Sequence, residues 1–363
     1  MIGHRTQNIV FNEREISSLL SERLSLEESL LGSLTRIRKG ETKFEDLDVN
    51  ADETSIFPGY DAGHFDLKPK DFVDEIEKNK ARYKITPMTD PVRVAAVDVS
   101  SVKLGAVEKG VLTAFRGCLV WKDDEKYHFY RYGPIISFVE ELSFWDEEAD
   151  QSKNMGVEAF FGTRAVSIMR NRFERILQKA AVDVFKDSII LFDGSLTAGT
   201  PDNPAGVLKE IIGAAWSNDN MVIGVSKETK VLAGEKKVTA LIEDGADACV
   251  ICLDDYMRER FPTHPIHLLG RVYVAKMARE GFTFRLDIST PGGVELDLRA
   301  VRLLAGNDLC GHGYPETLRL AHILSSFTSN EILGMRRYMS LNFRVEFKDE
   351  FDVRRILFGP FSS

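Results

Sequence analysis

Three apolar stretches in the first half of the chain have the length and β-rich composition of strands. They are VRVAAVDVSS at 92–101, VLTAFRGCLVW at 111–121 and EKYHFYRYG at 125–133. The short acidic connection KDDE between the second and the third is typical of a hairpin. The pattern therefore predicts an antiparallel meander, and the apolar run of its first strand ends on Asp98.

A long helix is predicted next, from about Val157 to Val184. Its apolar residues recur in steps of three and four and form one stripe, made of Val166, Met169, Phe173, Leu177, Ala180 and Val184. SIILFD at 188–193 then reads as a strand buried on both faces, and it ends on Asp193. PAGVLKEIIGAAW predicts a helix opened by Pro204, and NMVIGVSK at 220–227 predicts another strand.

The outer parts of the chain have a different character. Residues 12–40 are rich in leucine and charge at helical spacing and end on glycine, which predicts an amphipathic helical arm. The next residues lose this period and gain glycine, proline and acids. We therefore expect an N-terminal arm with a connecting segment over 1–90, a main domain with insertions over 91–345, and a tail over 346–363.

Composition narrows the class of protein. Hydrophobic residues make up 44% of the chain and charged residues 28%, which is ordinary for a globular protein. The formal net charge of −9 argues against a generally polyanion-binding surface, so any nucleic-acid contact requires a local basic groove. No apolar run reaches membrane-spanning length, and the start MIGHRTQNIVF lacks the features of a secretory signal. We expect a cytoplasmic protein.

Four cysteines are too few for a disulfide scaffold in a chain of 363 residues. The pair Cys249 and Cys252 has the C-x-x-C spacing of a metal or redox motif. It lies in an apolar, β-branched run with no second pair beside it, so a buried strand is favoured over a zinc site.

The order of the core elements, a three-stranded meander followed by helix, strand, helix and strand, resembles the ribonuclease-H-like fold. We therefore expect an α/β protein with a mixed sheet flanked by helices, and with further helices and strands after this core. In that fold, carboxylates on the first strand, the first helix and the fourth strand converge. Here those places hold Asp98, Glu174 and Asp193.

Each carboxylate also has a simpler explanation. Asp193 with Gly194 fits an ordinary turn, and Glu174 fits an exposed pair with Arg170 one helical turn away. Carboxylates that do converge repel one another unless a cation lies between them. Oxygen ligands of this kind suit Mg²⁺ or Mn²⁺, and two such ions about 4 Å apart support phosphodiester hydrolysis.

A later segment, GYPETLRLAHILSSF, predicts a helix that begins near Pro315. We expect Leu320, Ile323, Leu324 and Phe327 to form its apolar stripe, with His322 roughly opposite. His322 is then either a surface residue or a last-helix ligand that closes the metal site. An imidazole ligand favours Mn²⁺ over Mg²⁺.

Basic residues give a weaker signal for DNA. Several cluster on the helix of Glu174, and two follow the strand NMVIGVSK. They fit either a phosphate track or solvated surface charge, and they are Arg164, Arg170, Arg172, Arg175, Lys227 and Lys230.

Taken in order, AAVDVSS, the helix with Glu174, LFDGSL, VIGVSK and GYPETLRLAH resemble the NurA family of DNA nucleases. The resemblance covers about Val92 to His322 and implies Asp98, Glu174, Asp193, Tyr314 and His322 as catalytic residues. All of these except Tyr314 would be metal ligands. One departure is that Val99 follows Asp98 where the family commonly has glycine.

The resemblance also implies a manganese-dependent enzyme with single-strand endonuclease and 5′ to 3′ exonuclease activity. A ring-like homodimer that resects DNA ends with the hexameric HerA translocase is the implied assembly. Two other classes stay open. Actin-like ATPases and sugar kinases share the strand and helix order but need two copies of it, and a non-catalytic adaptor would lack part of the acidic set.

Overall fold

The structure, a computed structural model, describes residue 18 and the segments 82–107, 110–123, 125–140, 158–200, 203–229, 231–233, 236–242, 246–260 and 267–347. The predicted arm and connecting segment lie outside these residues except for Ser18 and 82–90, as does the predicted tail beyond Phe347.

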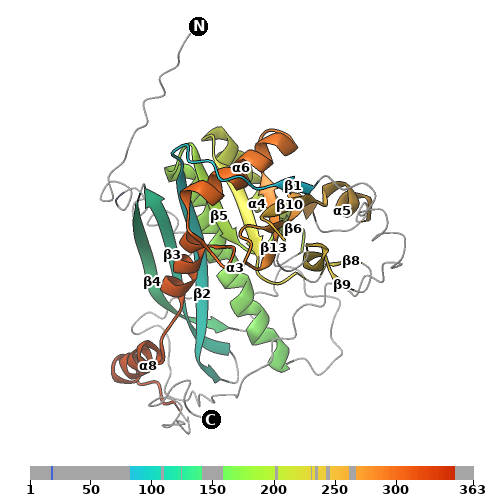
Figure 1. The fold of residues 1–363 in the computed structure, drawn as a ribbon. Helices are drawn as coiled ribbons and strands as arrows, with labels where there is room; N and C mark the ends of the chain where they lie inside the picture. The colour runs from blue at the N-terminus through green and yellow to red at the C-terminus, as the bar shows by residue number, and fades with distance from the viewer. Residues whose placement is uncertain are drawn as a thin grey trace.

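The main elements follow one another along the chain (Figure 1). They are β1 (Arg82–Lys84), β2 (Arg93–Val107), β3 (Gly110–Asp123), β4 (Lys126–Glu140), α3 (Glu158–Val184), β5 (Ser188–Asp193), α4 (Ala205–Ser217), β7 (Met221–Ser226), β10 (Cys249–Cys252), α5 (Asp254–Arg260), β12 (Arg271–Lys276), β13 (Thr283–Ser289), α6 (Val294–Asn307), α7 (Glu316–Ser325) and α8 (Ser329–Phe343). A 3-10 helix spans Val238–Leu241, and short pairs of strands join β6 (Thr197–Ala198) to β11 (His267–Leu268), β8 (Leu232–Ala233) to β9 (Lys236–Lys237), and β14 (Cys310–Gly311) to β15 (Tyr314–Pro315).

A nine-stranded sheet forms the centre, in the order β1-β10-β12-β13-β7-β5-β2-β3-β4. The pairs β2–β3 and β3–β4 are antiparallel, whereas β5 pairs parallel with both β2 and β7. This is the ribonuclease-H-like arrangement that the order of elements predicted. Strands β13, β12, β10 and β1 extend it in antiparallel fashion beyond β7.

The extension explains two features of the sequence. The segment with Cys249 and Cys252 is strand β10, as its apolar character predicted, and both cysteines are free. Strand β1 lies before Val92, within the segment expected to connect the arm to the core, and pairs with β10. The additional strands and helices after the core were also predicted.

Helices cover both faces of the sheet. On one face, α3 and α4 pack on alternate residues of the parallel strands, and the predicted stripe of α3 is largely buried there, from Met169 and Phe173 to Leu177. On the other face, α6 and α7 pack against Ala96 and Leu191. Among the described residues, no helix combines the length and apolarity that a membrane span requires.

Helix α6 is tied to the sheet extension through a buried aspartate. Asp297 is fully buried, and its carboxylate accepts two hydrogen bonds from the guanidinium of Arg271 in β12, one of them at 2.9 Å from Nη2 to Oδ1. The hydroxyls of Tyr273 and Thr290 each donate to it at 2.6 Å. A fixed cation and two hydroxyls therefore satisfy this carboxylate.

Candidate metal centre

The parallel register of β2 and β5 brings Asp98 and Asp193 together. Val97 pairs with Phe192, so the two aspartates that follow are level with each other. Side chains alternate along a strand, and Ala96 and Leu191 lie on the α6–α7 face, so Asp98 and Asp193 point to that face as well.

Asp98 does not end its strand, although the apolar run of the sequence suggested that it would. Strand β2 continues to Val107 because its hairpin with β3 continues, whereas β5 stops at Asp193. Asp98 therefore lies where β2 loses its parallel neighbour and keeps its antiparallel one. This position places the Asp98 carboxylate beside the edge at which β5 turns away.

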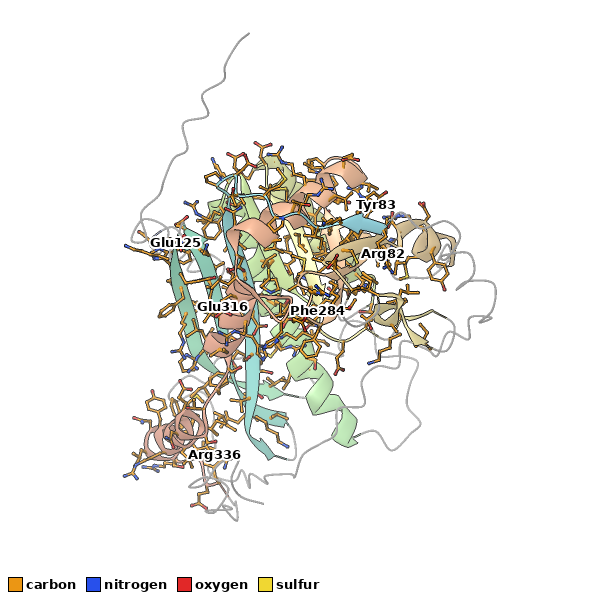
Figure 2. All side chains as sticks on the ribbon, in the orientation of Figure 1. Arg82, Tyr83, Glu125, Phe284, Glu316 and Arg336 are labelled. Carbon is orange, nitrogen blue, oxygen red and sulfur yellow. The ribbon has the colours of Figure 1, made fainter. Side chains whose placement is uncertain are left out.

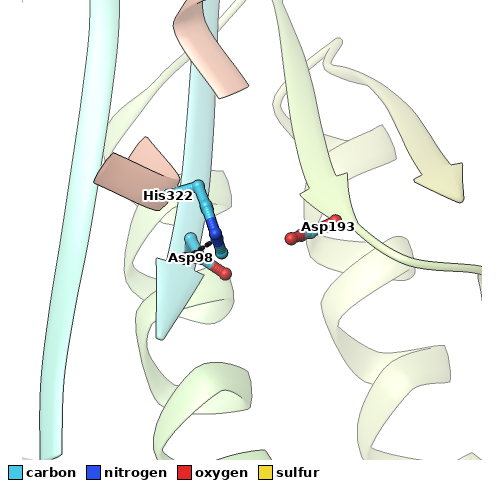
Figure 3. Close-up of side chains that lie close together, drawn as sticks. All are labelled: Asp98, Asp193 and His322. Carbon is cyan, nitrogen blue, oxygen red and sulfur yellow. Dashed lines mark hydrogen bonds and ion pairs between the residues drawn. The ribbon is translucent and has the colours of Figure 1, made fainter. Parts of the chain in front are cut away.

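His322 reaches the same place from α7. Its Nδ1 lies 3.2 Å from Oδ2 of Asp98 (Figure 3). Asp98, Asp193 and His322 each offer one ligand atom, and these atoms lie within 4.8 Å of one another. Two carboxylates and an imidazole form a donor set that fits Mn²⁺, and the carboxylates alone fit Mg²⁺ as well.

The face of α7 that packs on the sheet differs from the predicted apolar stripe. Its buried residues are Thr317, Leu318, Ala321 and Ser325. Ile323, expected in the stripe, is 50% exposed. The other stripe residues, Leu320, Leu324 and Phe327, are partly buried and pack against the core, as predicted. The prediction was wrong for Ile323 because it counted only apolar residues, whereas the buried face includes polar side chains. The start of the helix after Pro315 was predicted correctly.

Glu174 approaches the cluster from α3 on the other face of the sheet. It is partly buried, and burial is the main cause that raises its pKa to about 7. Asp98 and Asp193 raise this pKa further, whereas Arg175 and Arg170 oppose the shift. Glu174 therefore shares the electrostatic environment of the two aspartates, although it lies outside the group of three within 4.8 Å.

A network of hydrogen bonds holds the Glu174 side chain. The Gln178 amide donates to Oε1 at 2.8 Å, and Arg175 donates to Gln178 at 2.6 Å and to Asn203 at 3.0 Å. Arg175 therefore donates to this network, which is a role that the sequence did not suggest for it. Arg170 is exposed on the same helix, whereas the side chain of Arg164 and residue Lys230 lie outside the described residues.

Lys227 and Tyr314 complete the surroundings of Asp193. The Lys227 ammonium lies 2.8 Å from Oδ2 of Asp193 and 5.6 Å from the centre of the Tyr314 ring. The Tyr314 ring contacts the Phe284 ring edge-on, with 5.4 Å between the ring centres. Figure 2 labels Phe284, and it also labels Glu316, the first residue of α7.

The phenolic hydroxyl of Tyr314 is buried and has no hydrogen-bond partner among the described residues. Burial, followed by the charges of Asp193 and Asp98, raises its pKa, so the phenol stays protonated. A buried hydroxyl without a partner is costly, and one beside two carboxylates fits a site that receives a polar ligand.

The turn after Asp193 depends on two glycines. Gly194 has φ +102°, in the region that favours glycine, and its amide donates to Val225 O at 2.9 Å. A Cβ atom on Gly224 would lie only 2.6 Å from Gly194 O. The next amide but one, of Leu196, donates to the buried Asp287 at 3.0 Å. The backbone that carries Asp193 is thus fixed against β7 and β13.

Comparison with known proteins identifies the family of the chain. The model of the NurA domain matches residues 92–327, which is most of the chain. The chain belongs to the NurA family of nucleases. This NurA-family chain matches no curated protein.

Several solved structures are similar. The NurA nuclease from Sulfolobus solfataricus shares 13% identity, with a TM-score of 0.47 over 74% of this chain and 89% of that one. A NurA structure bound to dAMP and manganese shares 10% identity over 87% and 93%, with a TM-score of 0.38. Endonuclease V from Streptomyces avermitilis shares 11% identity over 76% and 97%, with a TM-score of 0.32.

Two contacts in the site were not anticipated from the sequence. The hydroxyl of Ser325 lies 2.6 Å from Oδ2 of Asp98, and Gln178 holds Glu174 as described above. Spacing could have suggested both, because Ser325 is three residues after His322 and Gln178 is four residues after Glu174. Residues at these separations lie on the same side of a helix.

Proposed function

We propose that this NurA-family protein is a metal-dependent deoxyribonuclease that hydrolyses phosphodiester bonds. The observation that carries the proposal is the convergence of ligand atoms from Asp98, Asp193 and His322 within 4.8 Å, beside the Tyr314 hydroxyl. We assign the metal ligands to these three residues and Glu174. All the acids that the resemblance implies, Asp98, Glu174 and Asp193, are present, which argues against a non-catalytic adaptor.

A divalent cation at this site would supply an activated water and stabilise negative charge on the phosphate and its leaving oxygen. The residues of the chain have their own tasks. The carboxylates and the imidazole would hold the ion, and the protonated Tyr314 hydroxyl would donate a hydrogen bond to a phosphate oxygen or to the attacking water. Lys227, which pairs with Asp193 at 2.8 Å, would be free to neutralise a substrate phosphate if Asp193 held the ion instead.

Manganese is the proposed cofactor, with magnesium as the alternative. The imidazole of His322 in the donor set favours Mn²⁺. The similar NurA structures that contain manganese support the same choice.

DNA is the proposed substrate, guided by Lys227, Arg170 and Arg164. These residues would contact phosphates without reading sequence, so binding should weaken as salt rises. Within the described residues the sheet contains one ribonuclease-H-like set of strands, whereas the ATPase alternative requires two.

The finer activity and the assembly are proposed on the family resemblance. They are single-strand endonuclease and 5′ to 3′ exonuclease cleavage in DNA end resection, a homodimer, and cooperation with a HerA-type hexameric translocase. Light scattering of the full chain tests the dimer. Adding a purified hexameric translocase to the nuclease assay tests the partnership, and unchanged cleavage would contradict it.

The test of the nuclease itself uses end-labelled single-stranded and double-stranded DNA with Mn²⁺, Mg²⁺ or EDTA. We expect cleavage with Mn²⁺, weaker cleavage with Mg²⁺ and none with EDTA. Labels on either end report polarity, and a circular single strand separates endonuclease from exonuclease activity. Cleavage that persists in EDTA would refute the metal-dependent mechanism.

A further inference from the structure

Ser325 is the last residue of α7 and lies beside Asp98. It is completely buried, and its hydroxyl has three oxygen neighbours: Asp98 Oδ2 at 2.6 Å, Ser100 Oγ at 2.9 Å and His322 O at 3.0 Å. A hydroxyl carries one proton and can accept further bonds. Which neighbour receives that proton decides what Ser325 does.

The carboxylate is the favoured acceptor. Its distance is the shortest of the three, and hydrogen bonds to a charged acceptor are about twice as strong as neutral ones. If Ser325 donates to Asp98, then Ser100 must donate to Ser325. Ser100 can do so because it is two residues after Asp98 on β2 and points to the same face. The hydroxyls thus form a directed chain from Ser100 through Ser325 to Asp98.

This chain ends on one particular oxygen of Asp98. Oδ2 receives the Ser325 hydroxyl and also faces Nδ1 of His322. Oδ1 has no hydrogen-bond partner in the part of the chain that the structure describes. A carboxylate that is held at one oxygen can offer the other to a ligand without losing its orientation.

The helix itself is held in place for this contact. Arg116 of β3, which is buried, donates to Ser326 O at 3.0 Å and to Glu331 at 2.7 Å, and its guanidinium lies 4.3 Å from the Phe327 ring. The end of α7 that carries Ser325 is therefore fixed to the sheet beside Asp98.

We propose that Ser325, supported by Ser100, is a positioning residue for the metal site: its hydroxyl holds Asp98 Oδ2 and thereby selects Oδ1 as the oxygen offered to a divalent cation. This inference rests on the proposed function. It explains how the protein orients the Asp98 carboxylate in the metal-free state.

The test measures Mn²⁺ binding to the metal-free full-length protein by titration calorimetry with MnCl₂. Ser325→Ala should weaken the affinity about tenfold, because loss of a partner that orients a ligand typically costs 10–100-fold. Ser100→Ala should weaken it less, since Ser325 then turns in part to His322 O. The matched control is Ser188→Ala, because Ser188 is also fully buried and donates to Lys186 O at 2.7 Å, at the opposite end of β5 from Asp193.

Thermal unfolding separates positioning from packing. Ser325→Ala and Ser188→Ala should lower the melting temperature to a similar extent, whereas only Ser325→Ala should lose Mn²⁺ affinity. Equal affinity in Ser325→Ala and the wild type, or an equal loss in Ser188→Ala, would overturn the proposal. If Ser325→Ala does not fold, Ser100→Ala decides, and unchanged affinity there overturns it.

Failure of the nuclease proposal would look different. A wild-type protein that binds Mn²⁺ but cuts no DNA refutes the proposed function and leaves the result for Ser325 standing. A wild-type protein that binds no Mn²⁺ refutes both.

Discussion

Asp98 and Asp297 are both buried aspartates on the α6–α7 side of the sheet, yet their surroundings are opposite. Asp297 is satisfied on both oxygens by Arg271, Tyr273 and Thr290. Asp98 has hydrogen bonds on Oδ2 alone and faces another carboxylate, that of Asp193. One carboxylate has a permanent cation, and the other has a place for one.

The partners of Asp98 and Asp297 distinguish a functional buried charge from a structural one. Burial alone does not separate them, because both carboxylates are largely removed from water. What separates them is whether the protein supplies the compensating charge. A buried charge without a fixed partner is costly, and it persists at Asp98 because, in our interpretation, the partner is a metal ion.

We expect the largest effect on cleavage from Asp193→Ala. We expect Mn²⁺-dependent cleavage to fall by more than about a hundredfold, because even loss of a residue that only orients a ligand costs 10–100-fold. Stability should change little, since the ion pair of Asp193 with Lys227 is partly exposed. Nuclease assays and urea unfolding measure the two effects. Wild-type cleavage rates in the variant would remove Asp193 from the site.

Asp297→Ala should show the converse. Removing one partner of a buried pair destabilises by about 3–5 kcal/mol, and we expect the lower end because Arg271 keeps some contact with solvent. Urea unfolding tests this, and Mn²⁺ affinity of the folded fraction serves as the control. A loss of Mn²⁺ affinity without loss of stability would contradict the structural role of Asp297.

His322→Ala refines the functional side. If His322 is a ligand, its removal should weaken the Mn²⁺ affinity at least about tenfold, and raised Mn²⁺ should restore part of the cleavage rate. Its side chain is 52% exposed, so stability should change by no more than about 0.5 kcal/mol. Normal cleavage by the variant at limiting Mn²⁺ would leave only the carboxylates as ligands.

Glu174 adds a pH dependence to the metal site. Its pKa in the folded, metal-free protein is raised to about 7 from 4.5, so the folded state holds this proton more tightly than the unfolded chain. The resulting stabilisation is present below pH 4.5 and is lost as pH rises to about 7. Mn²⁺ must displace the proton, so its affinity should rise by at most about tenfold per pH unit up to that pH.

Calorimetry at several pH values measures this dependence. Glu174→Gln is the control, because it cannot bind the proton and should flatten the profile while weakening Mn²⁺ binding. A slope that survives in this variant would assign the effect to another group.

Local patterns predicted the strands and helices of the core because each has its own period or apolar run. The position of the carboxylates followed once the order of elements was known, since parallel register places Asp98 level with Asp193. The continuation of β2 past Asp98 did not follow, because it depends on pairing with β3, which is a property of two segments.

The contacts of α7 were harder to predict for a related reason. Hydrophobicity assigned Ile323 to the buried face, and the structure exposes it while burying Thr317 and Ser325. A polar residue can be buried only where another element supplies its partner, and the partner of Ser325 is Asp98, far away in sequence. Periodicity within α7 could place Ser325 on the same side of the helix as His322, but it could not by itself identify Asp98 as the partner.

Gly224 holds no ligand and has no side chain, yet it limits how the site can evolve. Any larger residue would meet the carbonyl of Gly194 at 2.6 Å and push the backbone that presents Asp193. A survey that compares only acids and histidines would count such a variant as intact. A homologue with this fold can therefore keep the position of Asp193 only if residue 224 has no Cβ atom.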